Sequence, residues 1–264
     1  MIDQSCFPVQ FLSSFLAIAQ ARQQEGQQPD NLCGPYWVSI LLRSHGFDVT
    51  PEAVAQLAGT VLPVGDPASW LPTGATPKQD HSIPLPTTTS ASDAGTSAQG
   101  LIAAVDQLTQ NAYCLLPLQT HWSGDRVNAL LQLCQSWQTV PLCNVQTGNL
   151  WGSSLAVSDA IAYLNGQPIS PPSADWIVGH FLTLAGSVKG AAKQLIVVCD
   201  TYLQFGWQGY YLQSAEAVAQ ALNRNDGYGG GVLLFIPSEH QAAVREQAEA
   251  IGLTIEVWDN GSPI

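Results

Sequence analysis

The chain contains few charged residues, and basic residues are the scarcer kind. Only 11% of its 264 residues are charged, and 8 Lys and Arg stand against 20 Asp and Glu, which gives a formal net charge of −12. The basic residues are scattered, so no cluster could replace the counterions of a phosphate backbone or bind an anionic membrane surface. We therefore expect no nucleic acid and no membrane among the partners of this protein.

Long apolar runs and metal-binding motifs are also missing. No stretch approaches the roughly 18 apolar residues of a membrane span, and the apolar segment 11–19 lacks the basic flank of a secretory signal. The six cysteines form no CxxC pair, and no HExxH or EF-hand spacing occurs. These absences predict a soluble, cytoplasmic protein with reduced thiols and with no metal or other cofactor, and they leave its oligomeric state open.

The residues that are present predict one globular domain. Apolar residues make up 46% of the chain, which is enough for one sizeable core. Their periodicity indicates mainly helices over about residues 1–165 and mainly strands over about 166–264. Residues 61–95 interrupt the helical part with six prolines and many Thr and Ser, so they form either a functional loop or a disordered one. We expect a single α+β domain over residues 1–264, with a helical half packed on an antiparallel sheet.

Individual elements follow from the apolar period and from capping residues. Thr50, Ser123 and Ser214 stand at N-cap positions, and residues 238–241 have the form of a capping box. The expected helices cover residues 9–22, 34–44, 51–58, 97–108, 123–137, part of 149–164, 214–223 and 238–251. The expected strands cover residues 113–118, 140–145, 176–185, 194–199, 209–212, 229–236 and 253–257, with a hairpin turn at 186–193.

Cys33 stands where a polar, turn-prone stretch becomes an apolar helix. Free backbone N–H groups and the helix dipole at such a position favour the thiolate form of a cysteine. Pro35 fits the first helical turn, because the N–H that it lacks would have no partner there. These residues predict a nucleophile, and a small apolar side chain packed beneath the helix fits the local sequence equally well. Buried, inert thiols are expected in four apolar segments, at Cys114, Cys134, Cys143 and Cys199.

His180 is the histidine that its surroundings do not explain. It lies inside an apolar strand, where an imidazole has to be hydrogen-bonded or functional. Asp200 ends the next apolar strand, and the midpoint of 180 and 200 falls within the turn 186–193, so a hairpin would bring the two side chains together and let Asp200 orient the imidazole. The other four histidines have ordinary loop or helix-end explanations: His45, His81, His121 and His240.

These segments resemble the papain-like cysteine peptidase superfamily. The resemblance rests on Asn31-Leu32-Cys33-Gly34 before an apolar helix, on the strand that carries His180, and on Asp200 at the end of the following strand. Within the superfamily the segments are most similar to the bacteriocin-leader peptidases and to phytochelatin synthases. Thr201 departs from the leader peptidases, which usually have Pro after the Asp.

The resemblance implies a role for each of these side chains. It makes Cys33 the nucleophile, His180 the base and Asp200 the acid that orients the base. It also implies a glutamine shortly before the cysteine that stabilises the oxyanion together with the cysteine N–H. The usual spacing favours Gln27 for this role, and Gln28 is the alternative.

Three functions are compatible with such a site. The first is a cysteine peptidase or amidase that forms an acyl-enzyme from a peptide or small amide and releases it with water. The second is an acyltransferase on the same scaffold, in which an amine replaces the water, and the shared first half-reaction keeps the two indistinguishable in sequence. The third is a papain-like binding protein without turnover. The first is the function that we expect.

Overall fold

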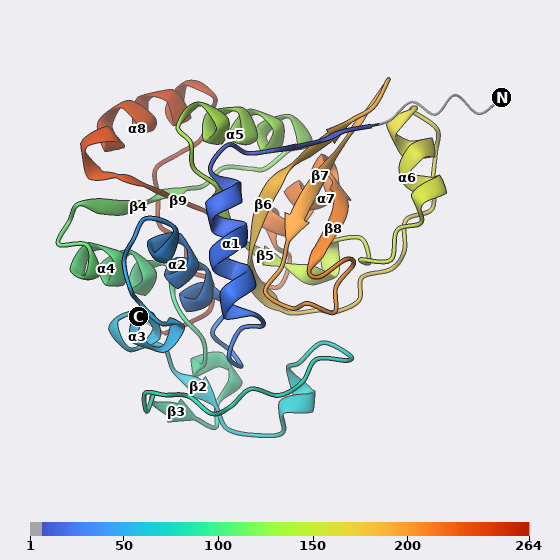
Figure 1. Cartoon of the computed structure of the whole chain (residues 1–264). Coiled ribbons are helices and arrows are strands. Elements are labelled where there is room, and N and C mark those ends of the chain that lie inside the picture. Colours follow the sequence, from blue (N-terminus) through green and yellow to red (C-terminus); the bar gives the residue numbers. More distant parts are fainter. Residues whose placement is uncertain (1–6, 264) are drawn as a thin grey trace.

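The structure, a computed structural model, describes residues 7–263 and is built around one antiparallel sheet (Figure 1). Within this range, which excludes Cys6, the sheet has seven strands in the order β4-β9-β5-β6-β7-β8, with β1 paired to β6. Every pairing in it is antiparallel. The strands are β1 (Val9–Phe11), β4 (Tyr113–Leu118), β5 (Pro141–Gln146), β6 (Gly179–Lys189), β7 (Gln194–Cys199), β8 (Tyr210–Ser214) and β9 (Gly231–Pro237).

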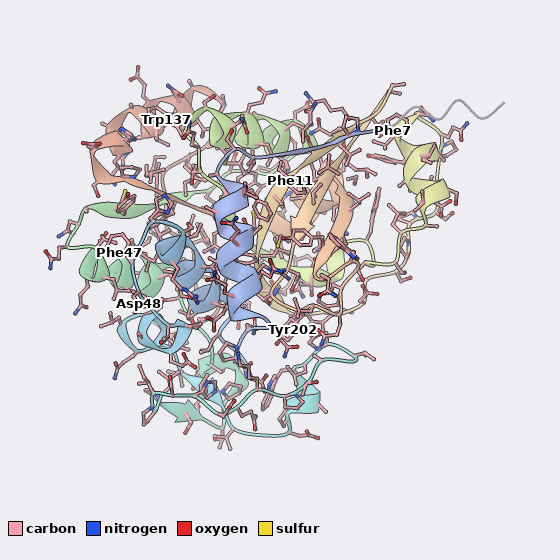
Figure 2. The ribbon with its side chains drawn as sticks, viewed as in Figure 1. Phe7, Phe11, Phe47, Asp48, Trp137 and Tyr202 are labelled. Carbon is pink, nitrogen blue, oxygen red and sulfur yellow. The ribbon has the colours of Figure 1, made fainter. Side chains whose placement is uncertain are left out.

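Helices pack against this sheet, with α1 and α2 in front of it and α7 behind it in Figure 1. The α2 helix contacts β6, α4 contacts β4, and α7 contacts β5 and β7. Apolar side chains fill the space between the sheet and these helices (Figure 2). None of the described helices has the length and apolar character that a membrane crossing requires. The helices are α1 (Phe15–Glu25), α2 (Cys33–Ser44), α3 (Pro51–Leu57), α4 (Ala98–Leu108), α5 (Gly124–Ser136), α6 (Val157–Leu164), α7 (Ala215–Asn223) and α8 (Gln241–Ala250).

Residues 61–95 form an irregular segment that is docked on the residues before α2. They contain a short parallel pair, β2 (Leu62–Pro63) with β3 (Thr87–Thr88), and two single 3-10 turns. The N–H of Asp30 donates to the carbonyl of Lys78 (2.9 Å), and the N–H of Lys78 donates to Asp30 Oδ1 (3.0 Å). The Lys78 ammonium also donates to the carbonyl of Gln27 (3.2 Å). Of the two alternatives for this segment, the structure therefore supports the ordered loop.

Much of the predicted secondary structure is confirmed, together with the α+β class. The strands expected at 113–118 and 194–199 match β4 and β7 residue for residue. The side chains of Thr50, Ser123 and Ser214 accept the expected capping hydrogen bonds at the starts of α3, α5 and α7. The sheet also takes β4 and β5 from the part of the chain before residue 165, so helices and strands alternate more than the two-part layout implied.

Residues 9–11 contradict the helix expected over 9–22. They form β1, because β5 pairs with β6 only as far as Thr183 and leaves the rest of that edge free. Gly186 permits this pairing, since a Cβ there would lie 2.2 Å from the carbonyl oxygen of Gln10. The hairpin turn is also shorter than expected. With a bulge between Leu184 and Gly186, β6 continues to Lys189.

Two further expectations near the C-terminus are wrong. The capping box predicted at 238–241 does not form, because a 3-10 turn over Ser238–His240 leads into α8 without a side-chain cap. Residues 253–257 form no strand either. One isolated bridge joins Thr254 to Gln119, and residues 255–260 then form neither helix nor strand. Asn260 donates to the carbonyl of Thr96 (3.0 Å), shortly before the start of α4.

Candidate active site

Cys33 is the first residue of α2, and its side chain is half-buried. Asn31 adopts a positive φ of 61°, so the chain turns sharply before the fully buried Leu32 and enters the helix. The Leu32 side chain caps no N–H, and the first-turn amides are therefore free to face the thiol. The backbone N–H groups of Gly34 and Phe181 lower the pKa of Cys33, because they favour its thiolate form.

Gly34 sets the distance between this helix and the sheet. A Cβ at this position would lie 3.0 Å from Leu101 Cδ1 and 3.1 Å from Phe181 Cδ2. A larger side chain would therefore push the start of α2 away from β6, the strand that carries His180. Glycine after the cysteine thus has a packing reason, which is the close approach of the start of α2 to β6.

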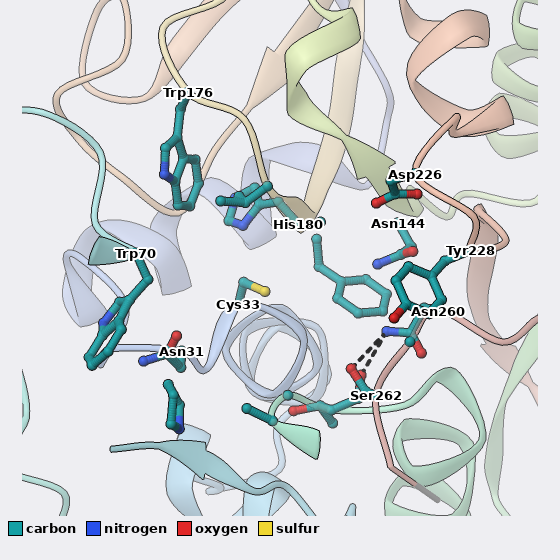
Figure 3. Close-up of a pocket in the computed structure, with 18 of the residues that line it drawn as sticks. Asn31, Cys33, Trp70, Asn144, Trp176, His180, Asp226, Tyr228, Asn260 and Ser262 are labelled. Atoms are coloured by element: carbon teal, nitrogen blue, oxygen red, sulfur yellow. Dashed lines mark hydrogen bonds between the residues drawn. The ribbon is translucent and has the colours of Figure 1, made fainter. Parts of the chain in front are cut away.

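His180 lies near the start of β6 with 1% of its surface exposed. Its Nε2 donates to Asp200 Oδ1 (3.1 Å), so Nδ1 is the ring nitrogen left for the thiol of Cys33, which lines the same pocket. The Trp176 ring packs edge-on against the imidazole, with 5.1 Å between ring centroids. Figure 3 shows His180 between Trp176 and Cys33. The predicted hairpin placement of His180 and Asp200 is confirmed.

Asp200 is fully buried and bonded through both carboxylate oxygens. In addition to His180, Oδ1 accepts from the Tyr202 N–H (3.1 Å), and Oδ2 accepts from the Tyr211 hydroxyl (3.2 Å). The Arg22 guanidinium holds the Asp200 backbone by donating to its carbonyl from Nε (3.0 Å) and from a terminal nitrogen (2.7 Å). A carboxylate with this many donors is fixed in position and stays ionised.

The three groups change one another's pKa values in the directions that an ion pair requires. Burial by itself raises the pKa of Cys33, but the positive charge of His180 and its hydrogen bond outweigh burial and lower it. Burial lowers the pKa of His180, and the charges of Asp200 and Cys33 raise it well above its usual range. For Asp200, burial raises the pKa, while His180 and the hydrogen-bond donors lower it below its usual value. These directions favour the thiolate form of Cys33, the imidazolium form of His180 and the carboxylate form of Asp200.

The structure corrects the choice of glutamine. Gln27 lies outside the pocket, where its side-chain amide donates to the carbonyl of Thr76 (2.8 Å) and accepts from Gln204 (3.1 Å). Gln28 lines the pocket of Cys33, is 1% exposed, and donates from Nε2 to the Tyr202 hydroxyl (3.2 Å). Because residues 76–78 engage Gln27, that residue anchors the loop, and Gln28 is the glutamine that lines the pocket of Cys33.

The pocket around Cys33 has a volume of about 410 Å³. In Figure 3, Asn31 and Trp70 lie on one side of the cysteine, and Asn144 and Tyr228 lie on the other. Trp70 comes from the 61–95 segment, so this segment forms part of the wall, as the loop interpretation expected. The pocket therefore extends to both sides of Cys33.

The remaining histidines and cysteines lie elsewhere. His180 is the histidine that lines this pocket, and His45 ends α2 while His240 precedes α8. Burial raises the pKa of each of the four thiols that were expected to be inert: Cys114, Cys134, Cys143 and Cys199. Within residues 7–263, no group of three or more His, Cys, Asp or Glu side chains is arranged to hold a metal ion.

Sequence reasoning missed several residues that position this site. Arg22 is 4% exposed and lies on α1, 178 residues before Asp200 in the sequence. A lone arginine in an apolar helix was a usable signal, since a buried guanidinium needs acceptors. Tyr211 and Trp176 gave no such signal, because aromatic residues are ordinary in strands and near their ends.

Comparison with known proteins places the chain in a family without an assigned activity. The model of the family of unknown function DUF6885 matches residues 12–259, so the chain belongs to this family. The matched range includes Cys33, His180 and Asp200. Neither the curated proteins nor the solved structures contain a match to the chain.

Proposed function

We propose that this member of the family is a thiol-dependent amide-bond hydrolase, a cysteine peptidase or amidase, in which Cys33, His180 and Asp200 act as a triad. The single observation that carries the proposal is that a partly exposed thiol at a helix N-terminus shares its pocket with a buried imidazole, which is hydrogen-bonded to a buried carboxylate. A thiolate is the reactive form of cysteine, and a nearby imidazolium and helix dipole both favour it. The placement of Cys33 at a helix start and of His180 on the facing sheet supports the papain-like interpretation.

The first half-reaction uses the thiolate and the imidazolium. Cys33 Sγ attacks the substrate carbonyl carbon, and the new oxyanion accepts hydrogen bonds from the Cys33 N–H and from Gln28 Nε2, which keeps one hydrogen beyond the one given to Tyr202. When the C–N bond breaks, the imidazolium of His180 gives its proton to the leaving amine. The products are the free amine and a thioester of Cys33.

The second half-reaction restores the enzyme. Neutral His180 takes a proton from water, the hydroxide attacks the thioester carbonyl, and the C–S bond breaks to release a carboxylic acid. The thiolate and the imidazolium are then regenerated. Asp200 keeps the imidazole in one tautomer and stabilises its positive charge, as its hydrogen bond to Nε2 favours.

Selective alkylation tests the nucleophile. Brief treatment with iodoacetamide between pH 5 and 9, followed by mass-spectrometric mapping, is expected to modify Cys33 first. The rate should reach its plateau below the pH at which an ordinary thiol of pKa about 8.5 does so. A faster reaction at another cysteine, or an inert Cys33, would contradict the proposal.

Turnover is tested with a peptide library. Cleaved members identify a substrate, and adding a primary amine then shows whether the acyl group goes to water or to the amine. Transfer to the amine alone would replace the hydrolase by an acyltransferase on the same site. A reactive Cys33 that cleaves no library member and forms no acyl-enzyme would favour the binding protein.

A further inference from the structure

One end of the pocket, beyond His180, is polar and has a fixed hydrogen-bonding pattern. Its lining combines an amide from β5 with residues from the loop after α7 and from the chain near residue 260. The only charged side chains that line this end within the described residues form an ion pair with each other, so it carries no net charge. The residues that define it, here called the amide end, are Asn144, Arg224, Asp226, Tyr228 and Asn260.

Arg224 organises the amide end. Its guanidinium is 3% exposed and binds the Asp226 carboxylate through Nε (2.9 Å) and a terminal nitrogen (2.5 Å). It packs on Gly179, where a Cβ would lie 3.0 Å from it, and Gly179 directly precedes His180. The backbone of Arg224 has a φ of 40°, a conformation that non-glycine residues rarely adopt. Backbone strain of this kind is concentrated at binding sites, where the surrounding contacts hold it.

The guanidinium decides which way the Asn144 amide faces. Arginine has only donors, so the atom that Arg224 contacts at 2.9 Å has to be the carbonyl oxygen, Oδ1. The amide nitrogen, Nδ2, then faces the other way and makes no hydrogen bond within the described residues. Figure 3 shows this nitrogen on the side of Asn144 that faces His180 and Cys33. Asn144 is only 2% exposed, and it lines the pocket. Its unpaired N–H groups can therefore donate only to a molecule that is bound in the pocket.

We infer that the amide end binds an uncharged carboxamide side chain, of the glutamine or asparagine type, on the acyl group that Cys33 attacks. This inference rests on the proposed function and specifies its substrate. The substrate carbonyl would accept from Asn144 Nδ2, and its NH₂ group would donate to Asp226, whose carboxylate oxygens each keep a further acceptor site. Asn144 and Asp226 both contact the same guanidinium, so the donor and the acceptor lie at the same end of the pocket.

Each alternative to a carboxamide either leaves a buried polar group without a hydrogen bond or places two groups of the same charge or kind opposite each other. A carboxylate would face Asp226 in a protein of net charge −12, and an ammonium would face the N–H groups of Asn144 and the guanidinium of Arg224. An apolar side chain would bury the Asn144 N–H groups without a partner. Sites built for a hydrogen-bonding group reject an analogue that lacks it for this reason.

Covalent probes of known composition test the inference. Capped dipeptidyl vinyl sulfones, with Gln, Leu, Glu or Lys at the first or the second position from the warhead, are allowed to react with Cys33. Each rate is divided by the iodoacetamide rate of the same protein, which removes differences in thiol reactivity. At one of the two positions, we expect the Gln probe to react about 10-fold faster than the Leu probe and faster still than the Glu and Lys probes.

Two substitutions at one position give opposite expectations. Asn144→Leu removes the donor, so the Gln advantage should disappear and the Leu probe should gain. Asn144→Asp keeps an acceptor for Arg224 and turns an oxygen toward the pocket, so the preference should move from Gln to Lys. The second variant keeps the contact to Arg224, and it carries the test if the first does not fold, as thermal unfolding would show.

The outcomes separate the two proposals. Equal normalised rates for all probes, or a preference that Asn144→Asp leaves unchanged, would overturn the carboxamide site while the thiol mechanism stands. A Cys33 that reacts with neither iodoacetamide nor any probe would overturn the proposed function, and this inference would fall with it. A Gln preference that reverses in Asn144→Asp supports both.

Discussion

The pocket has two walls that are held in different ways. On the sheet side, the carboxylate and backbone of Asp200 are bonded to His180, Tyr211 and Arg22, and all three of these residues are more than nine-tenths buried. On the other side, the segment 61–95 is fastened to the residues before α2 by partly exposed hydrogen bonds around Lys78. Reacting groups need a fixed geometry, whereas a substrate-contacting wall can tolerate local opening. We therefore expect substitutions in the sheet wall to change the rate of the chemical step, and substitutions in the loop wall to change KM.

The largest effect is expected from Cys33→Ala, which removes the nucleophile between the walls. We expect no turnover, with a free energy of unfolding within about 1 kcal/mol of the parent, because the lost side chain is small and half-buried. Urea unfolding and a cleavage assay measure the two quantities. Cys143→Ala is the matched control, since this fully buried thiol should affect stability and leave turnover in place. Full activity in Cys33→Ala would exclude the thiol mechanism, and failure to fold would identify Cys33 as a core residue.

The next effect is expected on the sheet wall, from Asp200→Asn. An amide cannot balance the charge of the imidazolium, and it can favour the wrong tautomer of His180, so turnover should fall on the order of 100-fold without vanishing. Single-turnover kinetics should show the loss in the acylation step and leave substrate binding little changed. Lost binding with an unchanged acylation rate would contradict the positioning role of Asp200.

A smaller effect concerns stability as a function of pH. The raised pKa of His180 contributes stability that is complete below about pH 6.5 and is lost as the pH rises toward its folded value. The lowered pKa of Cys33 acts in the opposite direction, because an unfolded thiol keeps its proton up to about pH 8.5. Between these two values the folded pair and the unfolded pair each carry one proton, so this pair should leave the stability of the parent nearly flat.

Removing the thiol should expose the histidine contribution. In Cys33→Ala, stability should fall between about pH 6.5 and 8.5, with a slope of at most about 1.4 kcal/mol per pH unit. Urea unfolding at several pH values measures this slope. His121→Gln, which changes an exposed histidine, should keep the flat profile of the parent. A parent profile that already falls steeply over this range would show that Cys33 and His180 do not form an ion pair.

The smallest effect is expected on the loop wall, from Lys78→Ala. This change removes the hydrogen bond to the Gln27 carbonyl and keeps the backbone bonds to Asp30, so stability should change by less than about 1 kcal/mol. We expect faster proteolytic cleavage within residues 61–95 and a higher KM, with kcat nearly unchanged. Lys189→Ala, on an exposed strand end, is the control. A large fall in kcat would show that this wall also positions the reacting groups.

Local signals were sufficient for much of the fold and for the placement of His180 beside Asp200. Caps such as Ser123 and apolar runs such as 194–199 act through neighbours in sequence, which is why these elements appear where expected. His180 and Asp200 could be paired because a hairpin is symmetrical about its turn, and a shift of the turn by a bulge did not separate them. Residues 9–11 failed this reasoning, because their partner, the free edge of β6, lies far along the chain.

The amino-acid sequence by itself determined which residues could react, since a thiol at a helix start and polar side chains at strand ends follow from local chemistry. The tertiary structure decided what surrounds them. Gln28, and not Gln27, lines the pocket, because a distant loop binds the Gln27 side chain. The side-chain amide of Asn144 has a defined orientation because Arg224, 80 residues later, contacts its oxygen. Positions and orientations of this kind depend on contacts between segments far apart in the chain, and those contacts exist only after the core has packed.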